Sequence, residues 1–182
     1  VFDMQPQPGG MLRYGIPEYR LPKDVMDREL QHVFDLGVDL QLNVKLGRDF
    51  TIDDLFAQGF DAVYIAIGAW TSNPLDAPGE EAEGVINAIA FLTDKVEGKF
   101  VPVQEGREVV VLGGGFTTFD CTRTSLRLGA KVHTGYRRSM KEMTATMEEI
   151  EDADAEGTHL MFYVQQTKVI VEDGKAKGLE FI

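Results

Sequence analysis

The spacing of apolar residues predicts an alternation of helices and strands along most of the chain. Apolar positions at helical intervals predict helices at 25–34, from Thr51 through Phe56, at 88–96, at 117–128 and at 147–155. Apolar runs and alternations predict strands at 38–42, 62–67, 108–112, 131–136, 159–164, 169–172 and 178–182. The first 22 residues are rich in Pro and Gly, which predicts an irregular loop.

Composition narrows the class of protein. With 182 residues, of which 43% are hydrophobic and 26% charged, the chain fits a soluble globular protein of one ordinary or two small domains. No apolar run approaches the roughly 18 residues that span a membrane. The net charge of −12 argues against nucleic acid and against anionic membranes as partners. The start at Val1, without Met or a signal pattern, favours a piece of a longer protein.

The strongest motif is a glycine turn between a buried strand and a helix. The strand at 108–112 leads into Gly113, which permits a tight turn, and Gly115, which lets a pyrophosphate approach the backbone. A second strand follows the helix, so the glycines stand in a β-α-β context. The predicted phosphate loop consists of Gly113, Gly114, Gly115, Phe116, Thr117 and Thr118. Its helix N-terminus offers free N–H groups and a positive dipole to phosphate.

The end of the second strand indicates which dinucleotide binds. An acidic residue there would bond to a ribose 2′-hydroxyl and repel a 2′-phosphate. This chain has Arg137 and Arg138 instead, about 20 residues beyond the glycines, where the motif expects the selecting residue. Two guanidinium groups suit a dianionic 2′-phosphate, so the sequence predicts NADPH.

No acid–base, nucleophilic or metal-binding group is indicated. The three histidines, at 32, 133 and 159, are scattered along the sequence, and each is interpreted as structural. The one cysteine, Cys121, lies within a predicted helix without a CxxC partner, which argues against a redox disulfide. A lone cysteine fits a reducing compartment, so we expect a cytoplasmic protein.

The segment from Pro8 to Pro22 resembles the glutamate synthase small (beta) subunit family and related NADPH:ferredoxin oxidoreductase-type flavoproteins. Similar segments follow in the same order: Gly47-Arg48-Asp49, Ala66-Ile67-Gly68-Ala69-Trp70, the Gly113 motif, Asp120-Cys121, Tyr136-Arg137-Arg138-Ser139 and Glu142-Met143. The resemblance covers nearly the whole chain and implies an α/β fold, in which a Rossmann-like NADPH domain is inserted into a split FAD domain. We expect residues 1–100 to form part of the FAD domain with its crossover, and 101–182 the NADPH domain.

The resemblance also implies roles for residues of the first part. Asp3 would meet the adenosine ribose of FAD, and Gly9, Gly10 and Arg13 would belong to the loop that lines the flavin. Ala66, Ile67 and Gly68 would close over FAD at a strand end. Electrons would pass from NADPH to FAD, then to iron–sulfur clusters and a larger partner subunit. Part of the FAD site is absent, so we expect the isolated chain to be inactive.

Three positions depart from the family pattern. The family usually has Asn, Ala and Pro where this chain has Phe116, Thr118 and Thr144. A bulky Phe116 could crowd the pyrophosphate, and β-branched Thr118 could push the helix away from the sheet. The alternative function is therefore a non-catalytic structural module with a degraded phosphate loop. A flavin-independent enzyme that uses NADH is a third possibility, which the flavin-loop resemblance disfavours.

Overall fold

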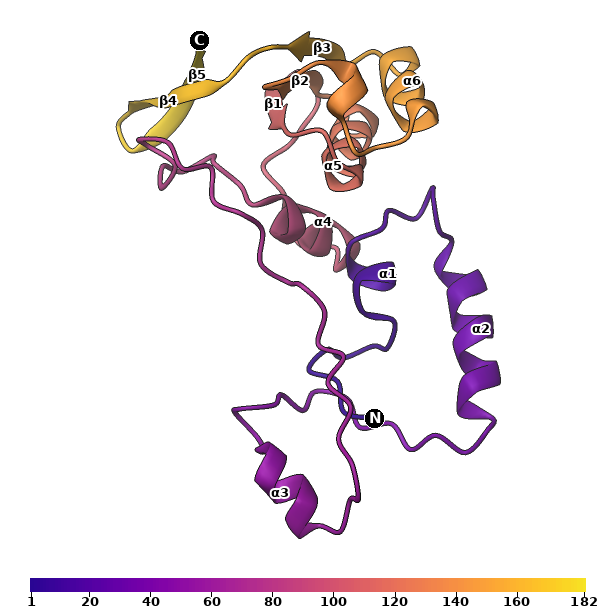
Figure 1. Ribbon diagram of the computed structural model, residues 1–182. Coiled ribbons are helices and arrows are strands. Elements are labelled where there is room, and N and C mark those ends of the chain that lie inside the picture. Colours follow the sequence, from indigo (N-terminus) through magenta and orange to yellow (C-terminus); the bar gives the residue numbers. More distant parts are fainter. The chain divides into compact units, whose positions relative to one another are not determined.

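Residue contacts divide the chain after Trp70. The computed structural model describes residues 1–182, and these form a first unit, Val1–Trp70, and a second unit, Thr71–Ile182 (Figure 1). The sequence favours a boundary near residue 100 between the FAD-binding and NADPH-binding parts. That boundary concerns cofactor binding and not contact density, so it stays a prediction.

The second unit contains a parallel sheet whose strands were all predicted. Its strands are β1 (Glu108–Leu112), β2 (Lys131–Tyr136) and β3 (His159–Phe162), in the order β1-β2-β3. Leu112 pairs with Gly135, and Tyr136 pairs with Phe162, so all three strands end at the same edge. The loops that follow them therefore meet at the carboxyl edge of the sheet, where ligands of open α/β sheets bind.

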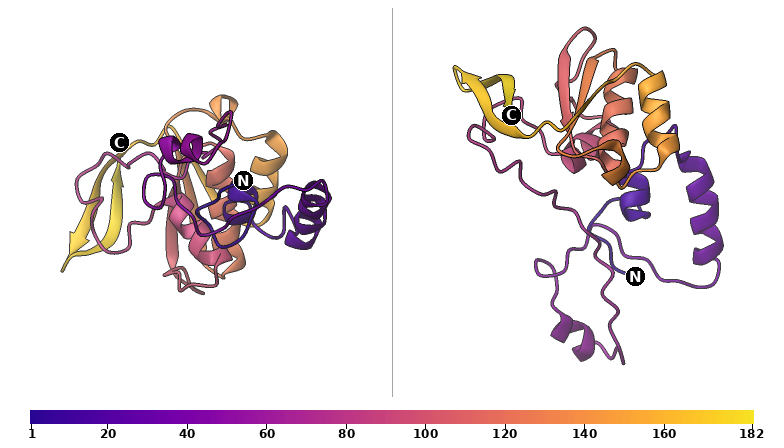
Figure 2. Two further views of the ribbon diagram at one scale, coloured as in Figure 1. Left: turned by 90° about the horizontal axis from the view of Figure 1, so that it is seen from below. Right: turned by 45° about the horizontal axis from the view of Figure 1, so that its top comes forward.

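Three helices pack on this sheet, and all three were predicted. They are α4 (Ala88–Val96), α5 (Phe116–Arg127) and α6 (Met147–Ala155), and Figure 2 shows α5 and α6 beside the strands. Phe91 and Leu92 of α4 pack against Cys121 of α5 and Val132 of β2. On the other flank of α5, fully buried Phe119 packs with the α6 core and with side chains of β2 and β3. The central helix α5 therefore joins two apolar clusters and fixes its own N-terminus against β1.

A hairpin completes the second unit. Its strands are β4 (Gln166–Glu172) and β5 (Lys175–Phe181), joined by Asp173 and Gly174. Both turn residues have positive φ, 51° and 75°, as the predicted Asp-Gly hairpin turn requires. Both strands begin three residues earlier than the sequence pattern indicated.

The first unit contains three helices: α1 (Gly10–Tyr14), α2 (Lys23–Phe34) and α3 (Ile52–Ala57). The latter two were predicted, and Thr51 caps α3 in a reciprocal capping box with Asp54. The prediction of an irregular loop over the first 22 residues is wrong at α1. Gly9 adopts a φ of 119° before a stretch without proline, which allows one helical turn to form.

Two strands predicted in the first unit are absent. Residues 38–42 form only an isolated bridge, in which Gln41 pairs with Phe2. Residues 62–67 are extended but unpaired, and Tyr64 and Ile67 are 92% and 66% exposed. A strand requires a hydrogen-bonded neighbour, and an apolar run alone cannot supply one. None of the helices combines the length and the apolar character that crossing a bilayer requires.

Candidate functional site

The glycine turn after β1 depends on Gly113 for its conformation. Gly113 has a φ of 133°, and its N–H donates to the carbonyl of Gly135 at 3.0 Å. A Cβ atom at this position would lie 2.4 Å from Oγ1 of Thr118. Both the backbone conformation and this close approach exclude a side chain, so Gly113 is required for the strand to turn directly into α5.

Gly114 joins the glycine turn to the loop after β2. Its carbonyl accepts hydrogen bonds from the N–H groups of Thr144, at 2.9 Å, and Ala145, at 3.1 Å. A Cβ atom here would lie 2.7 Å from the Tyr136 ring and 2.9 Å from the Met143 side chain. The two loops at the carboxyl edge of the sheet are therefore packed together through this glycine.

Gly115 differs from its neighbours because nothing in the fold requires a glycine there. Its φ of −102° and ψ of 175° suit any residue, and the nearest atom to an added Cβ would be Oγ1 of Thr144 at 3.4 Å. Gly115 caps α5, and the N–H groups of Gly115 and Thr117 have no acceptor within the chain. An open approach to unpaired helix N–H groups is the arrangement that binds phosphate.

The unusual residues of the loop differ in how far they are exposed. Phe116 is 44% exposed, so its ring lies partly in solvent. Thr117 is also exposed. Thr118 is only 8% exposed and its hydroxyl lies against Gly113, so the fold accommodates the larger third residue between helix and strand. The orientation of Phe116 toward a bound pyrophosphate stays a prediction.

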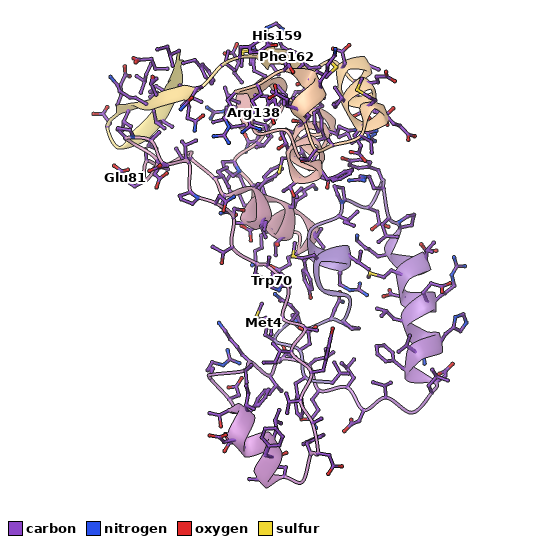
Figure 3. The ribbon with its side chains drawn as sticks, viewed as in Figure 1. Met4, Trp70, Glu81, Arg138, His159 and Phe162 are labelled. Carbon is purple, nitrogen blue, oxygen red and sulfur yellow. The ribbon has the colours of Figure 1, made fainter.

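The predicted arginines lie where the sequence placed them, directly after β2. Arg137 and Arg138 are both exposed, and neither forms an ion pair with a carboxylate. The backbone is held at this point, because the carbonyl of Arg138 accepts from Tyr163 N–H at 3.3 Å. Figure 3 labels Arg138 in the second unit, close to the carboxyl edge of the sheet. Two cationic side chains thus stand on a fixed backbone beside the glycine turn.

The loop after β2 continues in a short capped turn, which the sequence did not lead us to expect. Met140–Glu142 forms a 3-10 helix whose cap is Ser139. The hydroxyl of Tyr136 donates to the carbonyl of Glu142 at 2.9 Å. Hydrogen bonds from the backbone and side chain of Ser139 hold the pKa of the Glu142 carboxyl below its usual value. The spacing Ser139-x-x-Glu142 is a capping-box pattern and would have predicted this turn.

In the glycine loop of the first unit, the side chain of Arg13 already has partners within the chain. Gly9 and Gly10 have φ values of 119° and 52° and begin α1. Arg13 is 6% exposed; it donates to the carbonyl of Pro8 at 2.6 Å and forms an ion pair with Asp27 of α2. In this structure Arg13 therefore fixes the loop against α2, and its expected role near the flavin stays a prediction.

The other residues predicted to contact FAD lie outside the helices and strands. The Oδ1 atom of Asp3 accepts from the N–H of Gln5 at 2.9 Å. Ala66, Ile67 and Gly68 are exposed, with Gly68 at a φ of 67°. The indole N–H of Trp70 donates to the carbonyl of Ile67 at 3.1 Å, and its ring lies 5.8 Å from that of Tyr14. Trp70 thus orders the end of this segment.

The remaining reactive side chains offer no alternative site. Cys121 is 4% exposed, and burial followed by the nearby Asp120 charge raises the pKa of its thiol to about 12, which leaves it protonated. His133 and His159, scattered in the sequence, pair across β2 and β3 with ring centroids 5.6 Å apart. No group of three or more potential ligands is placed to hold a metal ion.

Comparisons with known proteins agree with this geometry. Residues 9–180 match the family model described as pyridine nucleotide-disulphide oxidoreductase. The chain is 41% identical over its whole length to the beta subunit of the NADP(+)-dependent formate dehydrogenase of Moorella thermoacetica, of which it covers 26%. It is 39% identical over its whole length to the glutamate synthase [NADPH] small chain of Escherichia coli, of which it covers 41%. The chain therefore spans less than half the length of these relatives.

A solved structure shows the same fold at lower sequence identity. A variant of FprA from Mycobacterium tuberculosis superimposes with a TM-score of 0.78 at 18% identity. The match covers 98% of this chain and 55% of that one. The architecture that the sequence predicted, a Rossmann-like domain with part of a second dinucleotide fold, is therefore confirmed.

Proposed function

Since the chain belongs to the pyridine nucleotide-disulphide oxidoreductase family, we propose that its second unit binds NADPH and positions it to reduce FAD. The observation that carries this proposal is the carboxyl edge of the sheet. There the unpaired N–H groups of Gly115 and Thr117 belong to one loop, and the exposed Arg137 and Arg138 belong to a neighbouring loop that Gly114 packs against it. The loops supply the two anion sites that NADPH needs, one for pyrophosphate and one for 2′-phosphate.

The residues of the second unit fit this dinucleotide. The α5 N-terminus would hold the pyrophosphate, which can approach because Gly115 has no side chain. Arg137 and Arg138 would hold the 2′-phosphate and discriminate against NADH, which has an uncharged hydroxyl at that position. The names of both relatives above specify NADP or NADPH, which supports the same choice. Neither of these relatives supports a non-catalytic module.

The first unit would contribute to a flavin site, with Asp3 at the adenosine ribose and Gly9 and Gly10 in the loop beside the flavin. Hydride transfer from NADPH to FAD is chemistry that the cofactors supply when both are bound. The residues of the chain bind and orient these groups, and none acts as an acid, base or nucleophile.

We extend the proposal to the assembly that receives the electrons. Both relatives are named as a beta subunit or a small chain, which supports a larger partner subunit. Onward transfer to iron–sulfur clusters is what the family resemblance implies. The relatives are also longer than this chain, which supports a longer flavoprotein that completes the FAD site. We place this protein in the cytoplasm, where NADPH is supplied and a lone thiol stays reduced.

Anaerobic reduction of bound flavin tests the proposal. NADPH added to the intact flavoprotein should bleach its visible flavin absorption, and NADH at the same concentration should do so much more slowly. If neither nucleotide reduces the flavin, or NADH acts as fast as NADPH, the proposed function is wrong. Replacing the thiol by Cys121→Ala should leave the rate unchanged, because this buried thiol takes no part in the electron path.

A further inference from the structure

A carboxylate is built into the loop that carries the two arginines. Oε2 of Glu142 accepts from both the N–H and the hydroxyl of Ser139, each at 3.0 Å. Ser139 directly follows Arg138, so the carboxylate is hydrogen-bonded to the residue next to the cationic pair. The charge of Arg138 stabilises the ionised carboxylate, after the two contacts from Ser139. Glu142 is therefore a permanent anion in this loop at neutral pH.

The backbone at the end of the short turn, where Glu142 stands, is also held. Tyr136 donates its hydroxyl to the carbonyl of Glu142 at 2.9 Å, and its ring packs over Gly114. Met143, the next residue, also packs over Gly114. The backbone at Glu142 is therefore held beside Gly114, and the carboxylate is held by Ser139. Its carboxylate also occupies both donors of Ser139, which would otherwise be open to a phosphate oxygen.

We propose that Glu142 sets the strength of the preference for NADPH over NADH, by opposing the 2′-phosphate that Arg137 and Arg138 attract. This inference rests on the proposed function. Because the carboxylate caps the turn, it keeps the loop ordered without ligand. Its negative charge also lowers the affinity of the arginines for the 2′-phosphate of both NADPH and NADP⁺. Such a site binds the nucleotide selectively and still releases it, since one fixed negative charge offsets part of the attraction.

The substitution Glu142→Gln removes the negative charge and keeps the size of the side chain. An amide oxygen can still accept from Ser139, as Gln does in capping boxes, so the turn is retained. In the full chain at low salt, NADPH should bind about two- to five-fold more tightly, because a repulsion across high dielectric is removed. NADH affinity should not change. The gain should shrink in about 1 M salt, where the Debye length falls to roughly 3 Å.

The matched control is Glu172→Gln, which removes the same charge from an exposed position in β4. It should leave the affinities of both nucleotides unchanged. An equal gain for NADH and NADPH in Glu142→Gln would mean a general charge effect and would overturn the inference. Weaker NADPH binding in this variant would show that Glu142 only supports the loop, and would overturn it as well.

The same titrations separate this inference from the function on which it rests. If Arg137→Ala and Arg138→Ala weaken NADPH but Glu142→Gln does not tighten it, the inference about Glu142 alone is wrong. If neither arginine variant affects NADPH, the 2′-phosphate site itself is wrong, and the proposed function fails with it.

Discussion

The fold requires two of the three glycines of the phosphate turn and leaves the third unexplained. Gly113 is fixed by its positive φ and by Thr118, and Gly114 by the side chains that pack over it. Gly115 has an ordinary backbone conformation and open space, with only Oγ1 of Thr144 within 4 Å of an added Cβ. A glycine that the fold does not require is best explained by the ligand that needs to approach it.

The substitution Gly115→Ala should therefore separate binding from stability. The free energy of unfolding should change by less than about 1 kcal/mol, because Ala fits this backbone and restricts the unfolded chain, while Gly is the better N-cap residue. NADPH and NADH should both bind at least about tenfold more weakly, because the methyl group occupies the approach of the pyrophosphate. Thermal unfolding and calorimetric titration measure the two effects.

Gly114→Ala is the contrasting variant. Its Cβ would meet the Tyr136 ring, so it should lower stability by about 1–3 kcal/mol as well as binding. Unchanged dinucleotide affinity in Gly115→Ala would show that the turn does not hold the pyrophosphate.

At the scale of elements, a line of buried hydroxyl groups connects α5 to the sheet. Thr122 of α5 lies 2.9 Å from Thr134 of β2, and Thr134 lies 2.9 Å from Thr158, measured between Oγ1 atoms. Thr158 donates to the carbonyl of Val132 at 3.1 Å. All three threonines are buried. The line holds α5 in register with β2, and so holds the phosphate turn at its N-terminus.

Thr134→Val should break this line without changing the packed volume. The hydroxyl of Thr122 would lose its partner in the core, so we expect a loss of about 1–3 kcal/mol in the free energy of unfolding. Thr124→Val provides the control on the same helix, because the Thr124 hydroxyl is buried without a hydrogen-bond partner. Denaturant titration should find that variant unchanged or more stable. Equal losses in both variants would contradict the role given to the line.

The elements that the sequence predicted correctly are those whose signals are local. The strand–turn–helix around Gly113 and the cap at Thr51 depend on residues within a few positions of each other, so pattern alone indicates them. The run 62–67 has the composition of a buried strand, but a strand also needs a neighbour, which no local pattern reports. The pairing of Arg13 with Asp27 likewise depends on how α2 packs, so the sequence could not indicate it, and the role of Arg13 beside the flavin stays a prediction.

In the candidate site, too, the features with local sequence signals could be predicted, and those that depend on long-range packing could not. Arg137 and Arg138 could be predicted because their distance from the glycines is set by one helix and one strand. The proximity of His133 to His159 depends on the register of β2 and β3, which the sequence does not state. The packing of Tyr136 and Met143 over Gly114 brings together residues far apart in the chain, and it became evident only in the structure.

At the scale of the molecule, the first unit exposes large apolar side chains. Tyr64, Ile65 and Ile67 are 92%, 53% and 66% exposed, within one unpaired extended segment. Several large apolar side chains exposed along one segment are typical of a surface that another part of a protein covers. The chain covers 26% and 41% of its two relatives, so we propose that further sequence of a longer flavoprotein pairs with this segment.

A polypeptide of these 182 residues should therefore purify without flavin. Its FAD site would lack the further sequence proposed above, and residues such as Asp3 and Gly9 alone provide few contacts. The visible absorption spectrum of the purified chain, and of the chain after incubation with FAD, measures this directly. A stoichiometric flavin band in the purified chain would contradict the prediction and show that the first unit is a complete FAD domain.

The central claim is that the second unit selects NADPH through the arginines after β2, and titration of both nucleotides tests it most directly. Calorimetry should show tighter binding of NADPH than of NADH to the unchanged chain. Arg137→Ala should weaken NADPH about tenfold or more, since a lost charged contact is worth about 1.5–3 kcal/mol, and should barely affect NADH. Arg107→Ala, an exposed arginine that precedes β1, should change neither. Equal losses for NADPH and NADH in Arg137→Ala would contradict the account.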